Sequence, residues 1–313
     1  MISSLFRVIK ALFFIFIILQ FVPAIIVSTK QMLDTAMHPK TQIGLLPING
    51  MISDASFYTK RLDAFLKDDE IKGLILRINS PGGHSGCCQA IFNELKHFAA
   101  KKPVVALIEN VGASGSYYIA AASNTIIASP LSLVGSIGTY MEIANIKQLL
   151  TDWHVEHTYV QAGKYKTAGS MTKDLTPDEM VYLQKLADDQ YLCFVQEIAQ
   201  ARKLDAASHR AWADGRVFNG TRALEHRLID KLGSITDAVT EIKKLAHIDE
   251  LESIKLIQIP HQAGWLRQVL VGNGDEADGD GLDAAATVAT FAHGVTKHFY
   301  ALQAAGSTPT SVC

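Results

Sequence analysis

Short apolar runs along this chain alternate with longer amphipathic segments, a pattern typical of an α/β protein. Strands are predicted at residues 42–48, 72–78 and 103–109, and helices at residues 57–67 and 85–100. Alternation of this kind favours repeated βαβ units and a mainly parallel sheet.

The second half of the chain continues this pattern. Thr176-Pro-Asp-Glu179 has the form of a capping box with proline at the first helical position, and it predicts a helix running to about Ala201. A helix is also expected at residues 234–246 and a short strand at residues 251–259. Residues 154–160 (HVEHTYV) are a further strand candidate.

Residues 11–28 contain no charged side chain. As a helix these 18 residues would span about 27 Å, close to the thickness of a bilayer's hydrocarbon core. Arg7 and Lys10 precede the run and Lys30 alone follows it, so we expect a membrane anchor with a cytoplasmic N-terminus and the rest of the chain outside. The alternative is a cleaved signal peptide, but no A-x-A site follows the run.

The end of the chain differs in composition from the rest. The Gly/Asp-rich residues 272–281 predict a flexible linker, because their acidic residues lack the distal glutamate of an EF-hand loop. Residues 283–304 predict an alanine-rich helix. The expected organisation is an anchor at 1–29, a linker at 30–41, a catalytic domain at 42–262 and a linker and tail at 263–313.

Composition excludes several classes of function. The net charge of −2 supplies no basic field for nucleic acid, and no nucleic-acid-binding motif occurs. The four cysteines, at positions 87, 88, 193 and 313, have the spacing of neither a disulfide framework nor a metal site. With no H-E-x-x-H among the eleven histidines, we expect no metal and no cofactor.

A candidate nucleophile lies in residues 110–118 (NVGASGSYY), directly after the strand predicted at 103–109. Ser114 stands at the turn into a predicted helix, where backbone N–H groups lack intrahelical partners. Ser116 is the competing serine, and Gly112 and Gly115 on either side of Ser114 favour the latter.

Two other segments offer what a serine nucleophile needs. In residues 79–83 (NSPGG), the two glycines leave a backbone N–H uncovered, so Gly83 and Gly115 are candidate oxyanion donors. The loop at residues 163–168 carries Lys166 as a candidate base, with Lys164 as its competitor. A lysine acts as a base only when neutral, which requires burial to lower its pKa by roughly 3 units, or about 4 to 5 kcal/mol.

These segments together resemble the signal peptide peptidase A family, the serine-lysine proteases of peptidase family S49. The resemblance covers roughly residues 42–248. It rests on an ordered set of motifs: Asn79–Gly83, Ala113–Ile119, Ser129–Pro130, Gly135–Gly138, Gly163–Lys166, Asp214–Gly220 and Leu228–Gly233. The chain departs from the family pattern at Ser116 and at residues 84–88 (HSGCC).

The resemblance implies a ClpP/crotonase-like α/β fold of repeated βαβ units behind an N-terminal transmembrane helix. It implies that Ser114 is the nucleophile, Lys166 the general base, Gly83 and Gly115 the oxyanion hole, and Ser136 a hydroxyl that orients the lysine. It further implies apolar peptide substrates such as remnant signal peptides. The enzyme would be a homo-oligomer with active sites at subunit interfaces, in the cell inner membrane with its catalytic domain on the extracytoplasmic side.

Four alternatives remain at this point. A Clp-type protease would need a histidine soon after the serine, and none occurs between His97 and His154. A crotonase-like acyl-CoA enzyme would leave the pairing of Ser114 with Lys166 unexplained. The others are a related protease that acts on a membrane protein partner and a non-catalytic membrane scaffold.

Overall fold

The structure is a computed structural model that describes residues 41–259. The predicted anchor, the helix at 283–304 and the linker at 272–281 lie outside the described residues. Among residues 41–259, no helix is long and apolar enough to cross a membrane.

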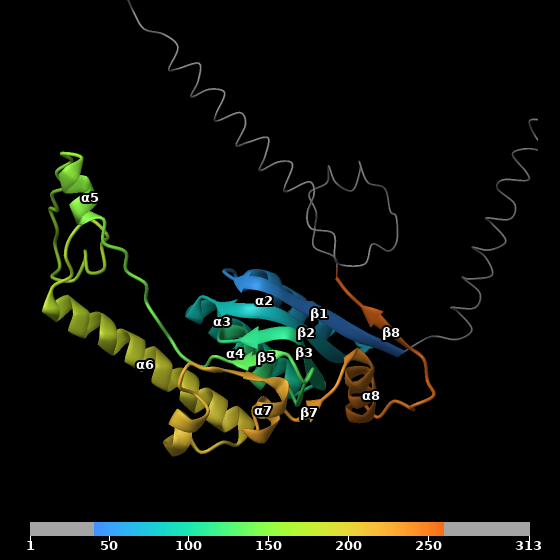
Figure 1. Ribbon diagram of the computed structural model, residues 1–313. Helices are drawn as coiled ribbons and strands as arrows, with labels where there is room; N and C mark the ends of the chain where they lie inside the picture. Colours follow the sequence, from blue (N-terminus) through green and yellow to red (C-terminus); the bar gives the residue numbers. More distant parts are fainter. Residues whose placement is uncertain (1–40, 260–313) are drawn as a thin grey trace, which may run out of the picture. The chain divides into compact units, whose positions relative to one another are not determined.

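An eight-stranded, mostly parallel sheet forms the centre of the described chain (Figure 1). Six strands follow the order β6-β5-β3-β2-β1-β8, while β4 pairs with β3 and β7 with β4. Only the pair β5–β6 is antiparallel among the pairs described. The strands are β1 (Thr41–Ile52), β2 (Ile71–Gly83), β3 (Val104–Ala113), β4 (Thr125–Ala128), β5 (Leu133–Gly135), β6 (Val217–Asn219), β7 (Lys231–Leu232) and β8 (Ile254–Ile257).

The strand β3 has two different neighbours along the same edge. Its first half pairs with β4, from Val105 opposite Thr125 onward. Its last three residues pair with β5, and this pairing ends with Ala113 opposite Gly135. The residues that follow these two, Ser114 and Ser136, therefore leave the sheet side by side.

Side-chain alternation divides the core between the two faces of the sheet. On β2, Leu74, Leu76 and Ile78 belong to the large cluster packed against the helices α2, α3, α4 and α6. Ile75 points to the opposite face, where it joins the cluster covered by α8. The helices are α2 (Ser56–Lys67), α3 (Ser85–Ala99), α4 (Gly115–Ala121), α5 (Lys147–Asp152), α6 (Pro177–Arg202), the 3-10 helix η1 (Ala206–Ala211), α7 (Gly220–Glu225) and α8 (Ile235–Leu245).

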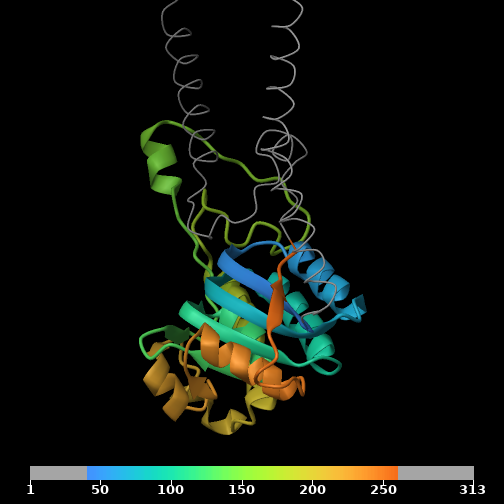
Figure 2. The same cartoon turned by 90° about the vertical axis from the view of Figure 1, so that its right-hand side faces the viewer.

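The helix α6 begins at the predicted capping box. The Thr176 hydroxyl accepts from the Glu179 N–H, and the Glu179 carboxylate accepts from the Thr176 N–H. Only the C-terminal part of α6 contributes to the core, through Phe194, Val195 and Ile198. Its N-terminal end and α5 stand away from the sheet in both views (Figures 1 and 2). We call residues 140–175, which include α5, the arm.

Most predicted elements are confirmed, and two differ. The strand predicted at 72–78 continues to Gly83, so the double glycine ends β2 rather than forming a separate turn. The strand predicted at 154–160 was wrong, because these residues have no regular secondary structure. They are all exposed and pair with no strand of the sheet, so their alternating pattern has no face to bury.

Candidate active site

Ser114 lies at a strained bend between β3 and α4. Its backbone has φ 52° and ψ −125°, a region that side-chain-bearing residues seldom adopt. The bend is held by the Ser114 N–H, which donates to the Gly135 carbonyl at 2.7 Å. The Ser114 side chain does not cap α4. A strand, a strained residue and a helix in this order expose a nucleophile above a sheet.

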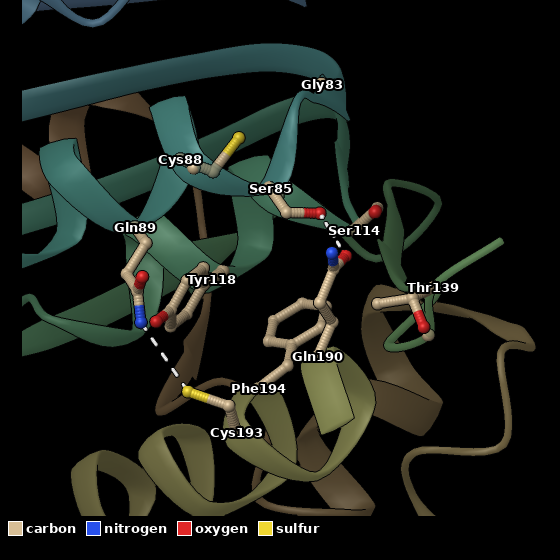
Figure 3. Close-up of a pocket in the computed structure, with 13 residues that line it drawn as sticks. Gly83, Ser85, Cys88, Gln89, Ser114, Tyr118, Thr139, Gln190, Cys193 and Phe194 are labelled. Atoms are coloured by element: carbon tan, nitrogen blue, oxygen red, sulfur yellow. Dashed lines mark hydrogen bonds between the residues drawn. The ribbon is translucent and has the colours of Figure 1, made fainter. Parts of the chain in front are cut away.

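A cavity of about 230 Å³ opens beside Ser114 (Figure 3). Its walls include Gly83 and Cys88 from the β2–α3 region, Tyr118 from α4 and Phe194 from α6. Side chains of this kind give the cavity a largely apolar lining. The cavity is many times the size of a single water site, so it has room for a group as large as a side chain.

The two predicted oxyanion donors lie next to each other. A Cβ placed on Gly115 would be 3.3 Å from the Gly83 nitrogen and 2.3 Å from the Cys88 sulfur. The His84 N–H donates to Ile52 on β1 at 2.9 Å. The Gly83 nitrogen thus lies close to Gly115, the residue that follows the bend at Ser114.

Ser116 has a different environment from Ser114. It is fully buried, and its hydroxyl donates to the Ser80 carbonyl at 2.6 Å and to the Ala113 carbonyl at 2.9 Å. These bonds join the start of α4 to β2, so Ser116 is placed as a structural hydroxyl.

Ser80 holds the double glycine at the end of β2 from the other side. Its own hydroxyl donates to the Gly50 carbonyl at 2.6 Å and accepts from the Gly82 N–H at 3.1 Å. A Cβ on Gly82 would lie 2.6 Å from the Gly115 nitrogen, so only glycine allows the end of β2 to approach the start of α4 this closely.

Cys88 is a wall residue that the sequence interpretation did not place in the site. Burial is the main cause that raises the pKa of its thiol to about 12, so the sulfur stays protonated at neutral pH. A buried, protonated thiol is a poor nucleophile, and Cys88 therefore acts through its volume against Gly115.

Ser136 is placed beside Ser114 by the sheet register. It follows β5 directly and also has a positive φ, of 49°. Its N–H donates to the Arg216 carbonyl at 2.9 Å. The structure thus brings four of the five predicted site residues into one region: Gly83, Ser114, Gly115 and Ser136.

Lys166, the fifth, lies on the arm and does not line the cavity. The neighbouring ring of Tyr165 stacks on Tyr182, near the start of α6, with centroids 4.6 Å apart. The cavity is instead reached by Gln190, eight residues further along the helix, or about 12 Å at 1.5 Å per residue. Lys166 is exposed, and within residues 41–259 its side chain has neither a hydrogen bond nor an ion pair.

Lys164, the competing lysine, is held in its charged form. It forms an ion pair with Asp178, and hydrogen bonding to that carboxylate raises the pKa of the ammonium. A lysine that is both exposed and paired with a carboxylate is a poor general base.

The helix α6 supplies three more cavity residues that sequence interpretation missed. Gln190, Cys193 and Phe194 face the cavity from the C-terminal half of this helix (Figure 3). Nothing in their sequence pattern separates them from the other positions of a long helix, because their role follows from where α6 crosses α4. Among the residues described, no group of three or more His, Cys, Asp or Glu side chains could hold a metal ion.

Comparison with known proteins finds relatives of this chain by sequence. A sequence model described as Peptidase family S49 matches residues 96–249. The chain is 36% identical over 223 residues to the "Putative protease" of Synechocystis sp., covering 69% of this chain and 80% of that protein. It is 35% identical over 202 residues to the "Putative protease" of Methanocaldococcus jannaschii, which covers 64% of this chain and 65% of that protein. It is 30% identical over 237 residues to the chloroplastic serine protease SPPA of Arabidopsis thaliana, which covers 75% of this chain and 35% of that protein. The alignments thus span slightly less than two thirds of the archaeal relative and about a third of the plant relative.

Proposed function

This chain belongs to peptidase family S49, a family of serine proteases, and from that premise we propose that it is a membrane-anchored endopeptidase with a Ser-Lys dyad. Ser114 is the nucleophile, Gly83 and Gly115 form the oxyanion hole, and Ser136 orients the lysine. Lys166 is the general base and comes from a neighbouring copy of the chain. The fold proposed for this domain is of the ClpP/crotonase type.

The separation of Lys166 from an otherwise assembled site is the observation that carries the shared active site. Ser114 lines an apolar cavity beside two close backbone N–H groups, whereas Lys166 stands exposed on the arm. A second copy that brings its arm to this cavity would supply the base and remove the lysine from water, which is what lowers a lysine pKa.

The surface of the arm supports its contact with another protein surface. Tyr140 is 85% exposed, Trp153 68% and Val160 101%. Several large apolar side chains on one projecting segment are typical of an interaction site. We propose a homo-oligomer in which the arm of each copy contacts the next one.

In the proposed reaction, the neutral Lys166 amine takes the Ser114 proton as the serine oxygen attacks the peptide carbonyl carbon. The carbonyl oxygen becomes an oxyanion held by the Gly83 and Gly115 N–H groups. The tetrahedral intermediate collapses as the lysine gives its proton to the leaving amine, and an acyl-enzyme remains. Lys166 then removes a proton from water, which attacks the ester and releases the second product with Ser114 restored.

The apolar cavity and the uncharged run at residues 11–28 support apolar peptides at a membrane as substrates, remnant signal peptides among them. We propose a single-pass protein of the cell inner membrane with the catalytic domain on the extracytoplasmic side. A membrane protein partner as the substrate is the alternative within the same chemistry.

Mixing two inactive variants tests the shared active site. Ser114→Ala and Lys166→Ala should each abolish cleavage of a fluorogenic apolar peptide. When they are co-assembled in equal amounts, about one quarter of the sites should regain an intact serine with an intact neighbouring lysine. Activity should therefore return to roughly one quarter of wild type.

Lys164→Ala is the matched control and should keep its activity. Co-assembled variants that stay inactive would refute the sharing of the site between copies. Full activity of Lys166→Ala would refute the dyad itself. Labelling of the protein by a fluorophosphonate, lost in Ser114→Ala, identifies the nucleophile independently.

A further inference from the structure

The lining of the cavity includes a polar bridge that the proposed chemistry does not use. The Ser85 hydroxyl, at the first residue of α3, donates to the Gln190 Oε1 on α6 at 3.3 Å. Figure 3 shows the two side chains meeting beside Ser114. The bridge thus lines the same cavity as the proposed nucleophile.

The Ser85–Gln190 bond is easily exchanged for another partner. It is long for an O–H···O bond, and Ser85 is exposed while Gln190 is half-buried. Replacing this hydrogen bond by an equivalent one to a substrate changes the free energy little. When a substrate enters, the Gln190 amide is therefore available to it.

Of the other polar side chains that line the cavity, those of Thr139 and Gln89 have partners, whereas the buried Tyr118 hydroxyl has none among the described residues. The Thr139 hydroxyl donates to the Ala187 carbonyl at 2.9 Å. The Gln89 amide donates to the Cys193 sulfur and to the Glu197 carboxylate, each at 3.5 Å. Gln190 is left as the amide whose only partner, among the residues described, is one weakly held hydroxyl.

An amide side chain suits a peptide backbone. A backbone unit that leaves water needs a partner for its N–H and another for its C=O. Gln190 supplies two donors and an acceptor in one plane, and so it can pair with either or both.

We propose that Gln190 is a substrate-positioning residue, which leaves Ser85 and hydrogen-bonds the backbone of a peptide lying across Ser114. This inference rests on the proposed peptidase function. It assigns to α6 a direct part in binding the substrate, in addition to its part in forming the cavity wall.

The kinetic test is the near-isosteric substitution Gln190→Met, which removes the hydrogen bonds and keeps the volume. It should raise KM for an apolar peptide about 5-fold with kcat within twofold, the pattern of lost ground-state binding. Ser85→Ala should leave KM unchanged or lower it, because it frees Gln190. Gln184→Met, the same change on α6 at an amide that bonds Asp188 and does not line the cavity, should change neither constant.

A purely structural bridge would give a different result. In that case Ser85→Ala and Gln190→Met would raise KM equally, and this outcome overturns the proposal. A KM within twofold of wild type in Gln190→Met overturns it as well.

Peptide binding separates this inference from the proposed function. In the Ser114→Ala background, fluorescence anisotropy of a labelled apolar peptide should show Kd about 5-fold higher with Gln190→Met. An unchanged Kd refutes the role of Gln190 alone, whatever the enzyme cleaves. Absence of cleavage by the wild type together with normal peptide binding refutes the proposed peptidase, and absence of any binding refutes both.

Discussion

The close approach of α3 to the start of α4 makes a quantitative prediction about Gly115. A methyl group there would put carbon 2.3 Å from the Cys88 sulfur, well inside the 3.5–4.0 Å at which non-bonded atoms rest. The neighbouring atoms are a fully buried side chain and the Gly83 nitrogen, which cannot move away freely. Overpacking of this kind costs about 1 to 3 kcal/mol, so we expect Gly115→Ala to lower the free energy of unfolding by about 2 kcal/mol.

Removing the Cys88 sulfur should relieve the clash. Cys88→Ala alone should cost about 1 kcal/mol through the lost buried sulfur. In the double variant the nearest remaining atoms are the residue-88 Cβ at 3.0 Å and the Gly83 nitrogen at 3.3 Å. The double variant should thus lose only about 1 to 1.5 kcal/mol, against about 3 kcal/mol if the effects added, a coupling of about 1.5 to 2 kcal/mol.

Urea unfolding of the four proteins, followed by tryptophan fluorescence at one protein concentration, measures this coupling. Additivity within about 0.5 kcal/mol would refute the packing argument. The rate of Ser114 labelling by a fluorophosphonate gives a second readout. It should fall in Gly115→Ala, whose backbone N–H is displaced, and recover in part in the double variant.

Four further variants test the roles assigned to polar groups. Tyr117→Phe should lower the free energy of unfolding by about 1 kcal/mol, because the buried Tyr117 hydroxyl donates to a backbone carbonyl at 2.8 Å. Tyr118→Phe should leave that free energy unchanged or raise it, because the buried Tyr118 hydroxyl has no partner among the described residues. Ser116→Ala should lower stability by about 1 to 2 kcal/mol yet leave the enzyme open to fluorophosphonate labelling, and loss of labelling without loss of stability would contradict the structural role. Hydrogen bonding from Lys173 lowers the pKa of Glu179 from its ordinary value of 4.5. The carboxylate therefore stabilises the fold fully above pH 4.5, and this stabilisation is lost as the pH falls through the lowered pKa. Glu179→Gln should reduce the dependence of the unfolding temperature on pH between about pH 6 and pH 2, measured by thermal unfolding.

The strands and the nucleophile turn could be predicted because local sequence determines them. Buried parallel strands are continuous apolar runs, and β2 and β3 each carry one before their glycine-containing ends. The small residues around Ser114 predict a tight bend without any knowledge of how the rest of the chain folds. The same local reasoning failed at residues 154–160, where an alternating pattern on the exposed arm has no sheet beside it.

The walls of the cavity could not be predicted, because they depend on contacts between distant segments. Cys88 is one of two adjacent cysteines, and only the packing of α3 on α4 distinguishes the buried one from its neighbour. Gln190 and Phe194 enter the cavity because α6 crosses α4 at that point. A periodic pattern gives the face of a helix, but it does not give the place along the helix at which a partner lies.

Backbone strain shows which half of the proposed site a single chain can build. Ser114 and Ser136 have φ of 52° and 49°, and they directly follow β3 and β5. Such conformations persist only where other contacts fix them. Here the Ser114 N–H donates to Gly135 and the Ser136 N–H donates to Arg216, both in the same chain. In the proposed mechanism, one copy of the chain therefore sets the geometry of the nucleophile and the oxyanion donors by itself. Only the proton acceptor, Lys166, is supplied by a second copy. Assembly would then control the protonation chemistry of the enzyme while leaving the shape of its binding cavity unchanged.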